Sequence, residues 1–217
     1  STNAKKPVSK EIINHLDSKE IVDILNFYEE HVRFCDSKNP TGVWKDINNY
    51  AKNHGVIHKK KYTYKDIDGI EREGEAFDYY EPYKNNEYVI IIKLNSKDNL
   101  LNILAHETMH IIDAYLKLKD FSYDWNNLNP EYFTYQNVYY PNVLYKDVLG
   151  TGKFKDEIYF VDNYARTNEQ EDRARLFESI CSCKNYEEYP NLNNKMNYLK
   201  KVLTTNFPEI SYIKAFE

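Results

Sequence analysis

This sequence has few cysteines, few glycines and no long apolar run, and each shortage excludes a class of protein. Three cysteines in 217 residues are too few for a scaffold held together by disulfides. The six glycines include a pair at 150 and 152, which lacks the spacing of a phosphate-binding loop. The longest apolar stretch, residues 88–92, is far shorter than the roughly 20 residues that span a membrane.

The sequence also lacks a region in which charges of one sign are concentrated. The net charge is −5, and acidic and basic residues are interspersed along the chain. A nucleic-acid-binding surface would need a cluster of Lys and Arg. We therefore expect no nucleic-acid partner.

The most informative stretch that is present is His106-Glu107-Thr108-Met109-His110. Residues four apart lie on one face of an α-helix, so both imidazoles can reach a single ion. Glu107 follows the first histidine, where its carboxylate can hold and deprotonate a water on the metal. The motif therefore predicts the zinc-binding helix of a metallopeptidase. The alternative is a half-buried helix whose histidines only form hydrogen bonds with their neighbours.

The residues around this motif predict a helix over 100–118. No glycine or proline interrupts LLNILAHETMHIIDAYLKL, and its apolar residues recur near helical spacing on one side. His106, His110 and Asp113 mark a second stripe. We expect Asp113 either to accept the free N–H of a histidine ligand, as metal sites usually require, or to face solvent.

A catalytic zinc site of this kind needs a third protein ligand and one open position. A metzincin would place a third histidine six residues after His110, but position 116 is leucine, which excludes that class. A glutamate from a second helix is the other common solution, and segment 164–178 supplies candidates. Thr167, with a glutamine three residues later, forms a capping-box pattern that predicts a helix beginning near Asn168.

Three glutamates of this second helix could be the ligand. Glu171, Ala174 and Glu178 share one face, and the small Ala174 would let the helix approach the first one closely. We choose Glu171 as the zinc ligand, with Glu178 and Glu169 as alternatives. The competing interpretation is an ordinary solvated helix with its charged residues in water.

A family resemblance rests on this second segment. Tyr164-Ala165-Arg166-Thr167-Asn168-Glu169, followed by Glu171-x-x-Ala174, resembles the catalytic domain of anthrax lethal factor and its relatives. These are gluzincin-type zinc peptidases with HExxH on one helix and Glu-x-x-Ala on the next. The resemblance covers roughly residues 100–180.

The resemblance implies a role for each matching residue. His106, His110 and Glu171 would bind Zn²⁺, Glu107 would be the catalytic glutamate, and Tyr164 would stabilise the oxyanion. A phenol can also donate such a hydrogen bond without adding charge near the zinc. Asp172 and Arg173 stand where relatives carry aromatic residues, which predicts a more polar or exposed surface there.

The expected fold is α+β. We expect a zincin-like metallopeptidase with a small β-sheet, the HExxH active-site helix and a C-terminal helical lobe. A single domain should cover 11–217, with helices and sheet to about residue 120, and residues 1–10 should be a linker or the remainder of a tag. Sequence patterns predict four further elements: a helix at 19–34, a hairpin turn at Asp68-Gly69, a strand at 88–93 and a closing helix near 192–203.

Residues 121–163 are rich in Asn, Tyr, Asp and Pro and show little periodicity. Their aromatic residues could cover the site or anchor a substrate side chain. Packing is the interpretation that we favour, because aromatic side chains mostly serve burial. The residues concerned are Trp125, Phe133, Tyr135, Tyr139 and Tyr140.

The motif and the resemblance together predict a zinc-dependent endopeptidase. It would hydrolyse peptide bonds through a metal-activated water, with Glu107 as general base and Tyr164 as oxyanion stabiliser. The partner would be a peptide or protein substrate, and the chain would be monomeric. The resemblance implies a secreted or cell-surface location, with the signal segment outside this sequence. The alternative is a non-catalytic, zinc-containing surface binding or toxin-like module.

Overall fold

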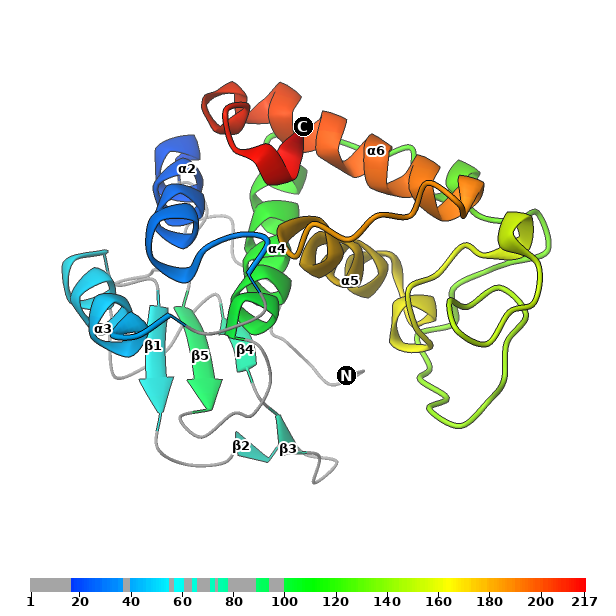
Figure 1. Cartoon of the computed structure of the whole chain (residues 1–217), viewed down its shortest axis with the longest axis horizontal. Helices are drawn as coiled ribbons and strands as arrows, with labels where there is room; N and C mark the ends of the chain where they lie inside the picture. Colours follow the sequence, from blue (N-terminus) through cyan, green and yellow to red (C-terminus); the bar gives the residue numbers. More distant parts are fainter. Residues whose placement is uncertain are drawn as a thin grey trace. The chain divides into compact units, whose positions relative to one another are not determined.

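Figure 1 shows the computed structural model of the chain, which divides into two compact units. The N-terminal unit ends at Phe121, and the C-terminal unit begins at Ser122. The predicted linker at 1–10 and the predicted turn at Asp68-Gly69 lie outside the described residues. The structure describes residues 17–36, 40–54, 57–60, 64–65, 71–72, 74–77, 89–93 and 100–217.

Helices and short strands make up the described part of the N-terminal unit. The helices are α2 (Ser18–Phe27), the π-helical turn η1 (Tyr28–Val32), α3 (Val43–His54) and α4 (Leu100–Leu118). The strands are β1 (Ile57–Lys60), β2 (Tyr64–Lys65), β3 (Glu71–Arg72), β4 (Gly74–Phe77) and β5 (Val89–Lys93). Strand β5 lies between β1, which is parallel to it, and β4, which is antiparallel, while β2 pairs with β3.

Helix α2 begins at a side-chain cap. The Asp17 carboxylate accepts a hydrogen bond from the backbone N–H of Glu20 at 3.1 Å, which satisfies one of the N–H groups that a helix start leaves open. We predicted one helix over 19–34. In the structure, α-helical geometry ends at Phe27 and the π-helical turn η1 ends at Val32, before the predicted end. The reason is Arg33, whose φ of 68° is incompatible with a right-handed helix.

Helix α4 spans the residues predicted for it, 100–118. Its apolar side is buried, with Leu101, Leu104 and Ile112 almost fully covered. At 19 residues it is the longest described helix, but its His and acidic residues break the apolar run. No helix within the described residues is long and apolar enough to cross a bilayer.

The α+β prediction is wrong. The described part of the chain is mainly helical, with 58% helix, and its β-sheet pairing is confined to the short strands before α4. The strands of the segment before α4 are only two to five residues long. Pairs this short give little independent stability. The strand and turn patterns before α4 are therefore not enough to define the fold class, and helices carry most of the buried apolar residues that the structure describes.

Two helices frame the C-terminal unit, α5 (Glu169–Cys181) and α6 (Pro190–Asn206). The closing helix predicted near 192–203 is confirmed as α6, which starts earlier because proline is well tolerated in a first helical turn. Phe216, near the C-terminus, stacks on Phe177 of α5 with 6.0 Å between ring centroids. Five short 3₁₀ turns complete the described part of this unit: η3 (Asn126–Leu128), η4 (Lys155–Glu157), η5 (Tyr164–Arg166), η6 (Pro208–Ile210) and η7 (Lys214–Phe216).

A long loop before α5 is organised around one arginine. Arg166 forms an ion pair with the buried Asp147, and its guanidinium lies 3.7 Å from the ring centroid of Tyr145 and 4.8 Å from that of Phe133. Tyr132 donates a hydrogen bond to the same carboxylate at 2.9 Å. These contacts fix the course of the loop, in which 3₁₀ turns are the regular elements that the structure describes.

Candidate functional site

The two histidines of HETMH face each other on α4. Their Nε2 atoms are 3.3 Å apart, and the ring planes cross at 83°. Two nitrogens that each lie about 2.0–2.1 Å from a tetrahedral zinc ion are themselves about 3.3–3.4 Å apart. The pair of His106 and His110 therefore fits two positions of a zinc site. One ring donating an N–H to the other would give a similar separation.

A buried hydrogen bond holds the helix beside these histidines. The hydroxyls of Tyr28 and Thr108 lie 2.6 Å apart, and either can donate. Both side chains are fully buried. Since Thr108 follows Glu107 directly, this contact fixes the rotation of α4 where the predicted general base stands. Glu107 itself is buried, so water reaches its carboxylate only to a limited extent.

Asp113, three residues after the second histidine, is buried. The alternative in which it faces solvent is therefore wrong. A carboxylate is costly to bury unless it is paired or hydrogen-bonded. Its predicted role, accepting the free N–H of a histidine, stays a prediction.

Helix α5 carries the predicted third ligand in its first turn. The side chain of Asn168 caps the helix by accepting a hydrogen bond from the backbone N–H of Glu171 at 2.8 Å. The helix thus begins where we predicted, but Asn168 and not Thr167 is the cap. Thr167 is buried, and its backbone carbonyl accepts a hydrogen bond from the N–H of Asn137 at 2.9 Å.

Burial separates the three candidate glutamates. Glu169 is 35% exposed and pairs with Arg173 at 3.4 Å. Glu178 accepts a hydrogen bond from Arg175 at 3.0 Å. Glu171 is buried, as a carboxylate that binds a metal would be. This favours Glu171 over the two alternatives.

The prediction of a polar or exposed surface at Asp172 and Arg173 is wrong, because both are buried. Asp172 Oδ2 accepts hydrogen bonds from Lys195 Nζ at 2.7 Å, Trp125 Nε1 at 3.0 Å and the Tyr135 hydroxyl at 2.5 Å. Burial lowers the pKa of Lys195, and the Asp172 carboxylate opposes this shift. We call these four residues the Asp172 cluster, and it anchors α5 next to Glu171.

Lys195 was not among the residues predicted from the sequence, although its position carried a signal. It occupies an apolar position of α6, three residues after Leu192 and four before Leu199, and both leucines are buried. A lysine on the apolar side of a helix is rarely fully buried without an acidic partner. The helical periodicity of this segment would therefore have predicted a buried acidic residue in contact with Lys195.

Tyr164 opens the turn η5 just before α5. The ring of Tyr139 meets it edge-on with 5.1 Å between centroids, and the guanidinium of Arg175 lies 4.8 Å from its centroid. The backbone N–H of Ala165 donates to the Asp162 carboxylate at 2.9 Å, which fixes the start of the turn. The phenol is therefore held by its neighbours on the C-terminal unit.

The two units divide the predicted site residues between them. The N-terminal unit contains His106, Glu107 and His110, which α4 brings together, and the C-terminal unit contains Tyr164 and Glu171.

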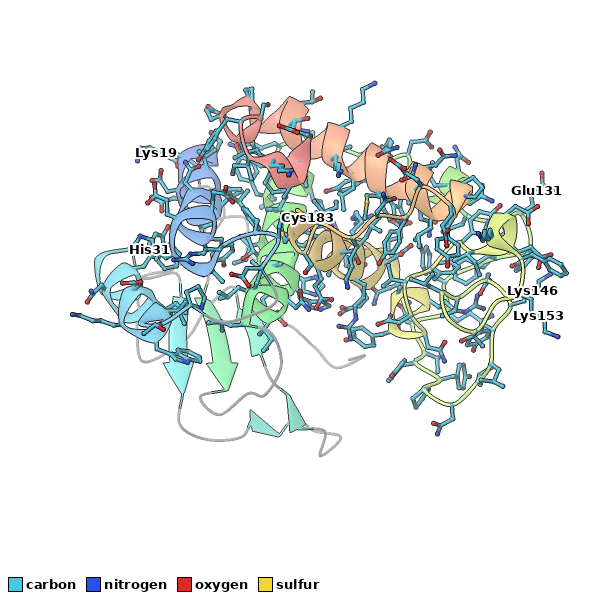
Figure 2. All side chains as sticks on the ribbon, in the orientation of Figure 1. Lys19, His31, Glu131, Lys146, Lys153 and Cys183 are labelled. Carbon is cyan, nitrogen blue, oxygen red and sulfur yellow. The ribbon has the colours of Figure 1, made fainter. Side chains whose placement is uncertain are left out.

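The aromatic residues of the loop fall into a buried or partly buried group and an exposed group. Trp125 is buried and Phe133 and Tyr135 are partly buried, which confirms packing for these three, whereas Tyr139 and Tyr140 are exposed. Figure 2 shows the side chains of both units.

Comparison with known proteins identifies no family. No protein-family profile and no solved structure matches the chain. A 64-residue part is 36% identical to IMP-specific 5'-nucleotidase 1 of Debaryomyces hansenii. The match covers 30% of this chain and 13% of that protein's length, so the similarity is confined to a short segment and shows no shared family.

Proposed function

We propose that the protein is a zinc-dependent endopeptidase. The observation that carries this proposal is the pair of histidines on α4, whose Nε2 atoms are 3.3 Å apart, with the buried Glu107 between them in sequence. Two imidazoles at this separation suit a tetrahedral zinc ion better than a larger, oxygen-preferring cation. A glutamate directly after the first histidine is the general base of such sites.

The third ligand in this proposal is Glu171. It offers a carboxylate oxygen, it is buried, and the Asn168 cap and the Asp172 cluster both hold the turn that bears it. The proposal requires the first turn of α5 to meet the histidines of α4. His₂Glu is an established ligand set for catalytic zinc, and the resemblance to gluzincin-type peptidases points to the same set.

Zinc, when bound, would supply a Lewis acid that favours ionisation of water and polarises a carbonyl. Glu107 would accept a proton from the attacking water and pass it to the leaving amine, since its carboxylate sits one residue from a ligand. Tyr164 would donate a hydrogen bond to the oxygen of the scissile carbonyl as negative charge develops on it. Asp113 would orient a histidine ring by accepting its N–H.

Metal analysis and peptide digestion test this proposal. Wild type should bind one zinc ion per chain and cleave members of a peptide library. Glu107→Gln should bind zinc but lose about 10²–10⁴-fold in rate, the usual contribution of a general base. Tyr164→Phe should lower kcat by about 10²-fold with little change in KM, because its hydrogen bond strengthens only in the transition state.

Glu178→Gln is the matched control, since Glu178 lies on the same helix and pairs with Arg175. It should keep both zinc and activity, whereas Glu171→Gln should lose zinc. Equal cleavage by wild type and Glu107→Gln would refute the mechanism. Zinc binding without any cleavage would favour the non-catalytic binding or toxin-like module. The assay should also include inosine monophosphate as a test compound. Release of phosphate from it, without any peptide cleavage, would refute the proposal of a peptidase.

A further inference from the structure

An exposed apolar segment, residues 138–144, lies in the loop before α5. Leu144 is 85% exposed, and the other four large apolar side chains of the segment are 43–49% exposed. No charged residue occurs between Glu131 and Lys146 in a chain that is 29% charged; both of these flanking residues are labelled in Figure 2. We call residues 138–144 the apolar segment.

The apolar segment is held next to Tyr164 by the preceding residue, Asn163. The side-chain amide of Asn163 donates hydrogen bonds to the carbonyls of Tyr140 and Val143, both at 2.8 Å, and makes a longer contact of 3.4 Å with that of Pro141. The ring of Tyr139 touches Tyr164 edge-on. The Asn163 side chain thus fixes the course of the apolar segment. The residue that follows it, Tyr164, is the predicted hydrogen-bond donor to the oxyanion.

Packing accounts for other aromatic residues of this loop but not for these. Phe133 and Tyr135 pack against the buried cluster of Val148, Phe160 and Ala165. The apolar segment points its side chains away from such cover, although exposing apolar area is unfavourable by about 25 cal/mol per Å². A contiguous apolar surface beside a polar group with a chemical role is typical of a ligand site.

We propose that the apolar segment is the specificity-determining surface of the peptidase and binds an uncharged apolar or aromatic side chain of the substrate. This inference rests on the proposed function, in which Tyr164 contacts the scissile carbonyl. An extended peptide advances about 3.3 Å per residue. A surface that begins 5.1 Å from the Tyr164 ring therefore reaches side chains within about two residues of the scissile bond.

The test is a cleavage profile measured with a peptide library randomised at two positions on each side of the scissile bond. Wild type should prefer apolar or aromatic residues over charged ones at one of these positions, by about tenfold or more in kcat/KM. The double variant V143E/L144E should lose that preference and gain a preference for Lys or Arg at the same position. Such a reversal cannot come from partial unfolding, which lowers all rates together.

Phe154→Ser is the matched control, because Phe154 is a 64% exposed apolar residue of the same unit outside the apolar segment. Its profile should equal that of wild type. Leu144→Glu alone serves as the second variant, since an 85% exposed side chain contributes little to folding, and it should show a smaller shift in the same direction.

The outcomes separate the two proposals. An active V143E/L144E or Leu144→Glu variant with the wild-type profile would overturn the apolar segment as the specificity surface and leave the peptidase standing. A wild-type profile without any apolar preference would also overturn it. Zinc binding without cleavage by wild type would overturn the endopeptidase, and the inference with it.

Discussion

Replacing Lys195 with methionine tests how strongly the Asp172 cluster holds the C-terminal unit. The ammonium and the carboxylate are both fully buried and 2.7 Å apart. Methionine keeps most of the apolar stem, so the variant mainly removes the positive charge and leaves the buried Asp172 carboxylate without its ion-pair partner. Breaking a buried ion pair in this way costs about 3–5 kcal/mol.

The structure places the expected loss near the lower end of that range. Asp172 Oδ2 keeps two donors, Trp125 Nε1 and the Tyr135 hydroxyl, and each neutral hydrogen bond offsets about 1 kcal/mol. We expect Lys195→Met to lower the free energy of unfolding by about 3 kcal/mol. For a chain of this size this corresponds to a fall in Tm of about 6–12 °C.

Urea denaturation followed by far-UV circular dichroism measures this loss. The double variant D172N/K195M should be more stable than Lys195→Met alone, because the neutral amide oxygen can still accept from Trp125 and Tyr135 without a buried charge. A loss below about 1 kcal/mol for Lys195→Met would refute the reasoning, since breaking a buried pair should cost more. A double variant less stable than the single one would refute it as well.

Two further predictions concern the C-terminal unit. Gly152→Ala should destabilise it by about 1–3 kcal/mol, because the added Cβ would lie 2.3 Å from the backbone oxygen of Lys146 and 2.2 Å from Ile158; an unchanged Tm would contradict this. Burial, and then the charge of Asp172, raises the pKa of Tyr135 above its ordinary 10.0. Above pH 10 the unfolded chain loses this proton while the folded one keeps it, so stability falls as pH rises. Urea midpoints measured across this range should decline less steeply in Tyr135→Phe than in wild type, and parallel declines would remove Tyr135 as a cause.

Local patterns in the sequence predicted the helices well. The 100–118 helix and the start of α5 near Asn168 followed from periodicity, from capping residues and from the absence of helix breakers. The HETMH motif placed both histidines on one face, and the structure brings their Nε2 atoms together. These features depend on residues within one or two helical turns of each other, which is why a sequence pattern can reveal them.

Contacts between distant residues were not predictable in the same way. The α+β class failed because a turn signal and a short strand pattern do not say whether the strands build a core. Asp172 and Arg173 looked solvent-exposed because a sequence shows their charge but not the partners that neutralise it.

The sequence by itself determined which residues stand on each helical face and therefore which chemistry α4 can offer. Only the tertiary structure decided that Lys195, 23 residues away, pairs with Asp172, and that Asn163 holds the apolar segment beside Tyr164. The physical reason is that helical periodicity arises from backbone geometry at short range. Burial and the pairing of charges depend instead on which segments meet after the chain has folded.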